Sequence, residues 1–287
     1  MRVAPENEEA LEAWNGVLFD RFLQYRRLVV DGLGAHGDEA LRLQAPREGE
    51  RALDIGCGFG DTAQQIARVV GRSGSVLGID VAPRFIDVAQ REARDAGLDH
   101  LRFAVADLQT TTFEETFDYA FSRFGTMFFA LPVPALRNVA AALAPGGRLC
   151  LVVWRRKLDN PWLHVAEEVV DQFVEEADAT DEPTCGPGPF SMANADIVAE
   201  QLTIAGFTDI GFRRCDIPYR IGADLDEAIS YNMAIGPAAE AIRLAGPQGD
   251  AVRAQVESAL RDALTPYAGT DGVILGASTW IVTARVS

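Results

Sequence analysis

Residues 51–62 read RALDIGCGFGDT, and this stretch decides the fold. Arg51–Ile55 is apolar enough to predict a short buried strand. Gly56, Gly58 and Gly60 then form a turn, after which a helical pattern begins. Because glycine tolerates positive φ and has no side chain, such a turn lets the backbone approach a ligand closely. The stretch therefore predicts a site for a flat or extended ligand.

Strands and helices alternate after this turn. The expected strands span residues 75–79, 101–106, 117–121 and 148–154, and the expected helices span residues 61–70, 83–96 and 134–143. This alternation predicts parallel βαβ units in a sheet covered on both faces. Ligands of such sheets bind beyond the carboxyl ends of the strands. The polar residues expected at those ends are Asp54, Asp80, Asp107, Ser122 and Arg123.

The N-terminal region carries an aromatic stripe. Residues 7–30 predict an amphipathic helix with aromatic side chains at helical spacing. Gly32, Gly34 and Gly37 predict a loosened linker, which would contain His36, before a short helix at residues 38–43. The aromatic side chains fit either core packing or the lining of a ligand pocket.

The second half of the chain is less regular. Helices are expected at residues 160–177 and 194–205, a loop at 178–189, and strands at 208–219 and 279–286. Between these two strands lie about fifty residues with helical pattern, at residues 225–235, 237–244 and 250–264. An insertion of this length is too long for an ordinary hairpin connection, and it predicts a cap or binding lid.

Composition limits the partners. Lys and Arg total 26 against 42 Asp and Glu, a formal charge of −16, which disfavours nucleic acid and anionic membranes. Cys57, Cys150, Cys185 and Cys215 lack the paired spacing of a zinc site or a disulfide framework, so we expect reduced thiols and no metal. No apolar run reaches the ~18 residues of a membrane helix, and the acidic start lacks the charge of a signal peptide. The sequence predicts a soluble cytoplasmic protein; a homodimer is compatible with it.

The charges beside the glycine turn discriminate between ligands. A dinucleotide site prefers G-x-G-x-x-G with a pyrophosphate at the helix N-terminus. Here the spacing is G-C-G-F-G, and the carboxylates of Asp54 and Asp61 would repel a pyrophosphate. A ligand with positive charge and no phosphate fits better, which favours S-adenosylmethionine.

Several ordered segments carry a family resemblance: ALDIGCGFGDTA, VLGIDVAPRFIDVA, FAVADLQ, FDYAFSRFGTMFF, ALAPGGRL and VVWRRKLDNPW. Together they resemble class I S-adenosylmethionine-dependent methyltransferases, in particular the ubiquinone/menaquinone-biosynthesis group. The resemblance implies an α/β fold with a doubly wound, seven-stranded, mostly parallel sheet. It also implies an N-terminal helical lid (1–45), a core (46–222 and 273–287) and a helical cap inserted between the last two strands (223–272).

The resemblance assigns residues to the cofactor S-adenosyl-L-methionine and its product S-adenosyl-L-homocysteine. It implies that Asp80 accepts hydrogen bonds from the ribose hydroxyls and that Asp107 accepts one from the adenine amine. The full implied cofactor set is Asp54, Gly56, Cys57, Gly58, Gly60, Asp80, Val81, Ala106, Asp107, Leu108, Ser122 and Arg123. Alternatives remain open: a helix cap or turn role for the carboxylates, an ion pair for Arg123, and a nucleophilic Cys57.

The acceptor is expected to be an apolar small molecule, aromatic or prenylated, methylated on O, N or C mainly through positioning. The expected lining is Trp14, Phe22, Tyr25, Phe124, Met127, Phe128, Trp154, Trp162 and Met192, with Phe190 and Met233 as further candidates. His164, after the fifth strand, is the candidate general base, against a surface or packing role. A nicotinamide-dependent oxidoreductase and a noncatalytic S-adenosylmethionine-binding relative are the alternative functions.

Overall fold

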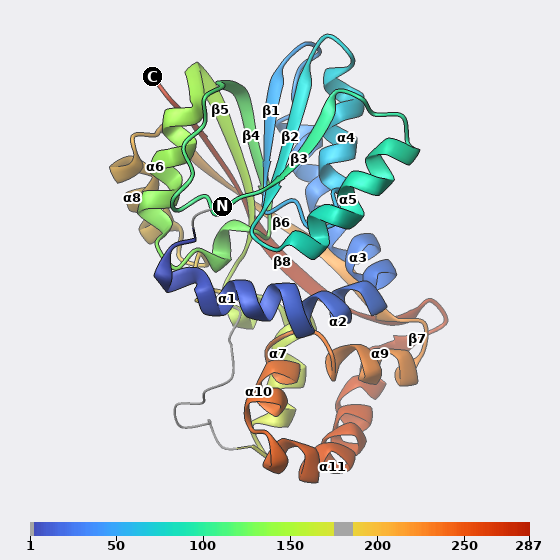
Figure 1. Cartoon of the computed structure of the whole chain (residues 1–287). Coiled ribbons are helices and arrows are strands. Elements are labelled where there is room, and N and C mark those ends of the chain that lie inside the picture. Colours follow the sequence, from blue (N-terminus) through green and yellow to red (C-terminus); the bar gives the residue numbers. More distant parts are fainter. Residues whose placement is uncertain (1–2, 175–185) are drawn as a thin grey trace.

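The computed structural model describes residues 3–174 and 186–287, which form a central sheet with helices on both faces (Figure 1). The strands are β1 (Arg51–Ile55), β2 (Ser75–Asp80), β3 (Leu101–Val105), β4 (Phe117–Arg123), β5 (Leu143–Trp154), β6 (Thr208–Gly222), β7 (Ala268–Gly269) and β8 (Gly272–Arg285). The helices are α1 (Glu8–Ala13), α2 (Phe19–Gln24), α3 (Arg26–Leu43), α4 (Asp61–Val70), α5 (Pro83–Asp95), α6 (Pro132–Ala142), α7 (Pro161–Val170), α8 (Ala195–Ala205), α9 (Leu225–Asn232), α10 (Pro237–Leu244) and α11 (Pro247–Leu264).

The strand order is β3-β2-β1-β4-β5-β8-β6, with the two-residue β7 paired to β8. Strands β1 to β5 are mutually parallel, whereas β8 runs antiparallel to both β5 and β6. This confirms the predicted doubly wound, mostly parallel sheet. The chain order reverses between β1 and β4, and a ligand crevice forms at such a reversal, beyond the carboxyl ends of the strands.

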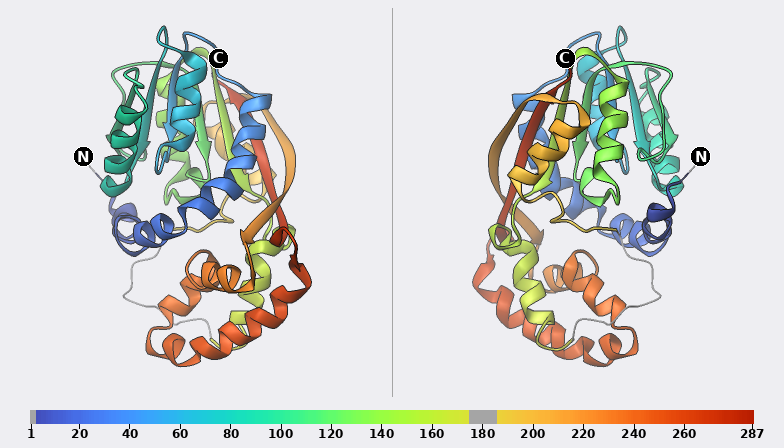
Figure 2. Two further views of the ribbon diagram at one scale, coloured as in Figure 1. Left: turned by 90° about the vertical axis from the view of Figure 1, so that its right-hand side faces the viewer. Right: turned by 90° about the vertical axis from the view of Figure 1, so that its left-hand side faces the viewer.

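Each face of the sheet has its own apolar core (Figure 2). On one face, side chains of α3, α4 and α5 pack on Ala52 and Val76. On the other face, α6 and α8 pack on Leu53 and Leu77. Successive strand residues point to opposite faces, so β1 and β2 are buried on both sides, as the nearly continuous apolar runs of a parallel sheet require.

The N-terminal helices differ from the sequence prediction. The chain makes a π-helical turn at Trp14–Leu18, with a kink at Gly16, and breaks again at Tyr25. The predicted loose linker is wrong: α3 runs unbroken through all three glycines and includes His36. Gly32 and Gly37 serve packing, because a Cβ at residue 32 would lie 1.6 Å from Cε2 of Tyr219 and one at residue 37 would lie 2.8 Å from Cδ of Arg123.

The C-terminal half follows the predicted order with different bounds. Strand β8 begins at Gly272 and not at Thr279, because Gly272, at φ +105°, ends a tight turn that pairs β7 with the start of β8. Helix α7 ends at Val170. Residues 175–177 of the predicted helix and 178–185 of the predicted loop, including Cys185, lie outside the described residues.

A second group of helices lies beyond the carboxyl ends of the strands. Helices α9, α10 and α11 come between β6 and β8 in sequence, and α7 packs against α10 and α11 (Figures 1 and 2). Helices α1 and α2 cross the space between this group and the sheet. The layers thus enclose the strand ends.

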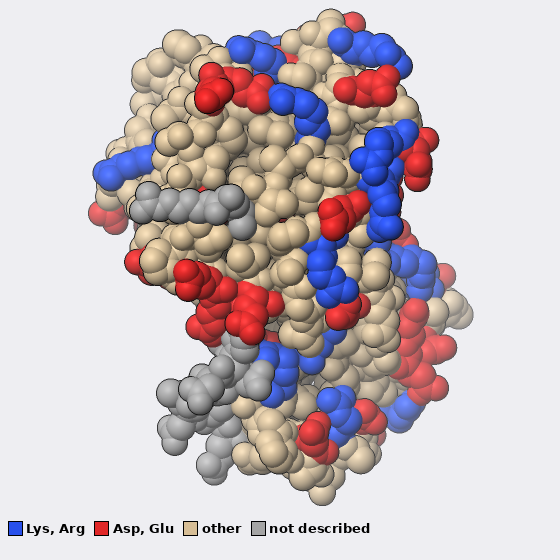
Figure 3. Space-filling view, viewed as in Figure 1, with Lys and Arg blue, Asp and Glu red and all other residues tan. Residues whose placement is uncertain are grey.

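The surface reflects the acidic composition. Figure 3 shows acidic side chains gathered around α1, where Glu6, Glu8, Glu9 and Glu12 are exposed. Among the residues that the structure describes, none of the helices combines the length and apolar character needed to cross a bilayer.

Candidate functional site

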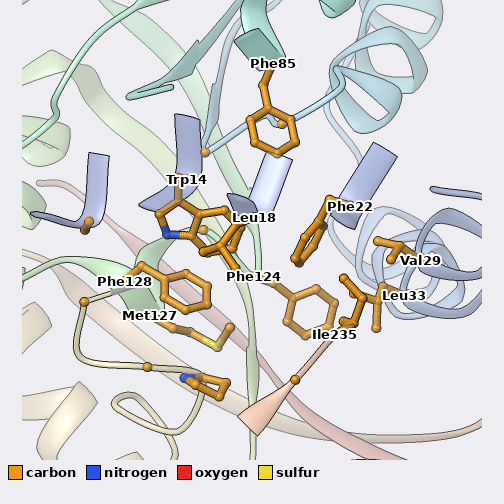
Figure 4. Close-up of a pocket in the computed structure, with 18 of the residues that line it drawn as sticks. Trp14, Leu18, Phe22, Val29, Leu33, Phe85, Phe124, Met127, Phe128 and Ile235 are labelled. Carbon is orange, nitrogen blue, oxygen red and sulfur yellow. The ribbon is translucent and has the colours of Figure 1, made fainter. Parts of the chain in front are cut away.

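A cavity of about 750 Å³ opens at the carboxyl ends of β1, β2, β3 and β4. One part of its wall comes from the glycine turn and the strand ends, and another from α1, α2 and α3. Further parts of the wall come from α7, from α10 and from the segment that joins α9 to α10, where Figure 4 labels Ile235. The cavity therefore lies where the strand order predicts a ligand.

The glycine turn forms one end of this cavity. Gly56 and Gly58 line it, and both have positive φ. A Cβ at residue 56 would lie 2.9 Å from Cα of Gly125, so the turn at the end of β1 and the segment after β4 approach each other too closely for a side chain. At residue 58 the nearest atom to a Cβ, on Phe85, is 4.0 Å away. Gly58 thus leaves the cavity wall bare of side-chain atoms.

Asp80 is the last residue of β2 and lines the cavity. Its Oδ2 accepts a hydrogen bond from the Gly58 amide at 3.0 Å, and its Oδ1 accepts one from the Ala82 amide at 3.0 Å. Burial raises the pKa of the Asp80 carboxyl, although these amides oppose the shift. A carboxylate has about four acceptor positions, so both oxygens retain capacity for a ligand diol.

Asp107 follows β3 and is almost fully buried. Its Oδ1 accepts from the backbone amide and the side chain of Gln109, at 2.9 and 3.2 Å. Its Oδ2 accepts from the Ala4 amide at 2.9 Å, so the chain's N-terminal segment is bound directly at the cavity wall. One acceptor position on Oδ2 is left for a ligand donor.

Much of the cavity wall is aromatic. The Phe124 ring stacks on Trp154 with ring centroids 4.2 Å apart and planes at 22°. Trp154 in turn contacts Trp162 at 5.3 Å. The Trp14 ring, which also lines the cavity, meets Phe128 edge to face with ring centroids 4.9 Å apart (Figure 4). Flat apolar walls of this kind suit an aromatic ligand.

Two arginines hold the N-terminal helices over the cavity. Arg84 in α5 donates to Asp20 at 2.6 Å and through its amide to the side chain of Asn15 at 3.0 Å. Arg26 in α3 donates to Asp61 at 2.9 Å and to Glu92 at 2.8 Å. The side chains of Arg26 and Asp61 are about three-quarters buried. Because α1, α2 and the start of α3 form one wall, these bonds fix the shape of the cavity.

The cavity collects most of the residues singled out in the sequence. Those that line it are Gly56, Cys57, Gly58, Asp80, Val81, Ala106, Asp107, Leu108 and Arg123 from the cofactor set, and Trp14, Phe22, Phe124, Met127, Phe128, Trp154 and Trp162 from the acceptor set. Those that lie outside its wall are Asp54, Gly60, Ser122, Tyr25, Met192 and His164.

The residues outside the wall have partners of other kinds. Ser122 donates to the Ile55 carbonyl at 2.8 Å and so joins β4 to β1. The Tyr25 hydroxyl bonds to Ser230, and His164 Nδ1 lies 3.4 Å from a Glu168 oxygen. Gly60 caps α4 at φ +79°, where a Cβ would meet Phe103 at 2.7 Å.

The sequence did not single out Leu18, Val29, Leu33, Phe85 or Ile235 as cavity residues. Leu18 belongs to the helical stripe that carries Trp14 and Phe22. Val29 and Leu33 continue this stripe along α3, where the glycines predicted a linker and not a helix. A prediction of one continuous helix through the glycines would have placed Val29 and Leu33 on the same face as Trp14 and Phe22.

Two buried groups at the glycine turn have shifted protonation. Asp54 is 1% exposed, and its Oδ2 has no hydrogen-bond partner among the described residues. Burial raises the pKa of Asp54 to about 7, while Arg123 opposes the shift. Burial also raises the pKa of the Cys57 thiol, so this side chain is held as a thiol. A thiol is a poor nucleophile, which disfavours the nucleophilic interpretation of Cys57.

His36 gives a pH-dependent stability. It is 1% exposed, its Nδ1 lies 3.0 Å from the Thr279 hydroxyl, and burial lowers its pKa to about 4. Between pH 7 and pH 4 the unfolded chain binds a proton at this residue, whereas the folded chain does not. The contribution of His36 to stability therefore decreases as the pH is lowered from 7 to 4. Asp54 acts in the opposite direction: because burial raises its pKa from 3.8 to about 7, its contribution to stability falls as the pH rises from about 4 to about 7.

We therefore expect His36→Gln to change the pH profile of unfolding. Relative to the variant, the wild-type chain should lose about 2 kcal/mol of unfolding free energy between pH 7 and pH 5. Urea unfolding of both chains at the two pH values measures this difference, and the Asp54 contribution cancels because both chains contain it. Parallel pH profiles for the two chains would contradict the assignment of a neutral buried His36.

Comparison with known proteins agrees with this geometry. A family model described as a methyltransferase domain matches residues 52–147. Aklanonic acid methyltransferase DauC of Streptomyces sp. (strain C5) is 37% identical over 126 residues, which cover 44% of this chain and 57% of that protein. The ubiquinone/menaquinone biosynthesis C-methyltransferase UbiE of Azotobacter vinelandii is 35% identical over 114 residues, covering 39% and 45%. The chain thus spans about half the length of the curated relatives it matches.

The fold has solved counterparts. A phosphoethanolamine N-methyltransferase 2 of Haemonchus contortus, solved with phosphomonomethylethanolamine and S-adenosylhomocysteine, aligns with 99% of this chain and 60% of its own, with a TM-score of 0.56 and 19% identity. At 19% identity this likeness shows a shared fold alone, whereas the sequence relatives and the family model show similarity in sequence over the methyltransferase domain. Residues 52–147 of the chain are therefore a methyltransferase domain, similar in sequence to the matching parts of these methyltransferases.

Proposed function

We propose that this chain moves a methyl group from S-adenosylmethionine to an apolar aromatic small molecule held in the cavity. The observation that supports the proposal is that one cavity is lined both by the glycine turn with Asp80 and Asp107 and by the aromatic side chains. A volume of about 750 Å³ falls in the range of ~300–1,000 Å³ typical of small-molecule sites.

The glycine turn and the carboxylates at the strand ends fit the cofactor. Asp80 would accept from the two ribose hydroxyls, since both of its oxygens keep acceptor capacity. Asp107 would accept from the adenine amine through Oδ2, and Val81 and Leu108 would flank the base. Gly56 and Gly58 would admit the methionine portion, and an approaching cation would favour the ionised form of the nearby Asp54, whose pKa burial raises to about 7.

The aromatic part of the cavity wall would hold the acceptor. When bound, S-adenosylmethionine supplies an electrophilic methyl carbon whose sulfonium leaves as a thioether while the acceptor's electron pair forms the new bond. The chain's part is to orient the acceptor between the Phe124 and Trp154 pair and the Trp14 and Phe128 pair, and to exclude water with α1 and α2. Positioning of this kind supplies roughly 7–11 kcal/mol of barrier reduction.

Quinones and polycyclic aromatic acids are the acceptor classes to test first. The names of the relatives specify demethylmenaquinone and aklanonic acid, and both classes are flat enough for the aromatic walls. In this proposal residues 1–45 act as a helical lid and 223–272 as a cap, on a core of residues 46–222 and 273–287. The segment that joins α9 to α10 contributes Ile235 to the acceptor end.

His164 is proposed as the base, with a test that separates this role from packing. Its neighbours Trp162 and Leu163 line the cavity, and its Nδ1 faces Glu168. If His164 removes a proton, His164→Gln should abolish the acidic limb of the pH profile of kcat. A variant with the wild-type pH profile would assign His164 to packing alone.

Two measurements test the proposed function. A thermal-shift comparison should show stabilisation by S-adenosylhomocysteine and none by NAD, because ligands that bind only the folded state raise its apparent stability. Stabilisation by NAD alone would support the oxidoreductase. A screen of reduced quinones and aromatic acids with S-adenosylmethionine, followed by mass spectrometry, should then detect the gain of one methyl group. Cofactor binding without methylation of any acceptor would support the noncatalytic relative.

A further inference from the structure

Arg123, the last residue of β4, places a guanidinium in the wall of the cavity. Within residues 3–174 and 186–287 the guanidinium of Arg123 makes no hydrogen bond and no ion pair. The carboxylates of Asp61, Asp54 and Asp38 act on it only at longer range. Burial lowers the pKa of Arg123, which reflects the cost of holding this charge away from water.

Helix α3 fixes the position of this side chain. A Cβ at residue 37 would lie 2.8 Å from Cδ of Arg123, and a Cβ at residue 34 would lie 3.5 Å from its Nη1. The stem of Arg123 therefore runs along a groove that Gly34 and Gly37 leave on the helix surface. The side chain is held in place although its charged end has no partner.

Three of the other charged groups in the cavity wall, which also contains Arg21 and Asp171, have partners of their own. Asp61 pairs with Arg26 at 2.9 Å, and Glu240 pairs with Arg243 at 2.8 Å. Asp80 accepts two backbone hydrogen bonds. A buried charge is expensive unless it is paired, and an arginine does not lose its charge in a protein. The half-buried guanidinium of Arg123 is therefore available in the cavity wall to pair with an anionic group of a ligand.

We propose that Arg123 binds the carboxylate, or an equivalent ionised oxygen, of a ligand that occupies the cavity. The inference rests on the proposed function, which offers two sources for such a group: the methionine carboxylate of the cofactor, or an acidic oxygen of the aromatic acceptor. The planar guanidinium matches a carboxylate through two parallel hydrogen bonds.

Paired ligands distinguish the two sources. One pair is S-adenosylhomocysteine and its decarboxylated analogue S-adenosyl-3-thiopropylamine. The other is 2-naphthoate and 2-naphthamide, titrated into protein saturated with S-adenosylhomocysteine. Calorimetry measures each pair on the wild-type chain, on Arg123→Met, and on Arg42→Met, which removes a charge from an exposed ion pair on α3.

We expect the wild-type chain to prefer the carboxylate member of one pair by tenfold or more. Arg123→Met should lose that preference and Arg42→Met should keep it, and the pair that responds identifies the source of the anion. Equal affinities within both pairs for the wild-type chain, or an Arg123→Met variant with the wild-type preference, would overturn the inference. Loss of the preference in Arg21→Met and not in Arg123→Met would also overturn it, since Arg21 also lines the cavity.

A second variant moves Arg123 without removing its charge. Gly37→Ala adds a methyl group against Cδ of Arg123 at a helical position that alanine favours. The chain should fold, and its preference for the carboxylate ligand should fall several-fold. If Gly37→Ala keeps the full preference, Arg123 does not act from its observed position. A failure of the proposed function gives a different result, because the wild-type chain would then not bind S-adenosylhomocysteine. In that case 2-naphthoate and 2-naphthamide, titrated without S-adenosylhomocysteine, would still test whether Arg123 binds a carboxylate.

Discussion

Replacing Asp80 by alanine should weaken the binding of S-adenosylhomocysteine by about 100-fold or more. The variant loses two hydrogen bonds from ribose hydroxyls to a charged acceptor, each worth ~1.5–3 kcal/mol. Asp80 lines the cavity at the end of β2, and the amides of Gly58 and Ala82 orient its two oxygens. Isothermal titration calorimetry of the wild-type and variant chains measures the ratio of dissociation constants.

A loss of fold must be separated from this loss of binding. Removing the Asp80 carboxylate also leaves two backbone amides without their acceptor, which should cost about 1–3 kcal/mol of unfolding free energy. Urea unfolding of the unliganded chains measures that cost. Asp99→Ala removes a carboxylate whose side chain is 81% exposed, and it should bind S-adenosylhomocysteine like the wild-type chain. An unchanged dissociation constant for a folded Asp80→Ala variant would refute the ribose assignment.

The strand ends could be predicted from sequence because each is marked locally. In β1 and β2 a short apolar run stops at a glycine turn or at a carboxylate, and both signals lie within ten residues. Parallel pairing then brings the ends together, with Ile55 opposite Ile79 and Asp80 one residue beyond. The doubly wound arrangement was implied by the family resemblance, and the order of the strands was not predicted, since no local pattern determines which strands pair.

The far wall of the cavity was harder to predict. Tyr25 shares the helical stripe of Trp14 and Phe22, but the break after α2 turns its ring toward Tyr231. Ile235 lies in a short connection between helices, where no periodicity marks an inward side chain. Residues of this kind are placed by contacts between segments far apart in the chain, which a single sequence does not reveal.

The three glycines of α3 show the same limit most clearly. Within a window of ten residues, glycine at positions 32, 34 and 37 indicates a flexible segment, because glycine is unfavourable in a helix. The reason for Gly32 is Tyr219, nearly two hundred residues later in the chain. The Tyr219 ring is fully buried, and its hydroxyl bonds to Tyr231 at 2.6 Å and to the Leu28 carbonyl at 3.2 Å.

Gly32→Ala and Gly34→Ala should therefore change stability in opposite directions. A Cβ at residue 32 would lie 1.6 Å from Cε2 of Tyr219, so the helix or the buried ring must move, and we expect a loss of about 3 kcal/mol. At residue 34 the nearest atom to a Cβ is 3.5 Å away, an ordinary contact, and alanine should stabilise the helix by ~0.5–1 kcal/mol.

Urea unfolding of both variants measures the two changes in unfolding free energy. Each variant is a control for the other, because both replace glycine by alanine in the same helix and change the helix propensity by the same amount. A loose linker would give two small effects of the same sign. Opposite signs follow only from a continuous α3 packed on Tyr219. Equal stabilisation of both variants would show that Gly32 is not in contact with the ring and that the helical path through residues 26–43 is wrong.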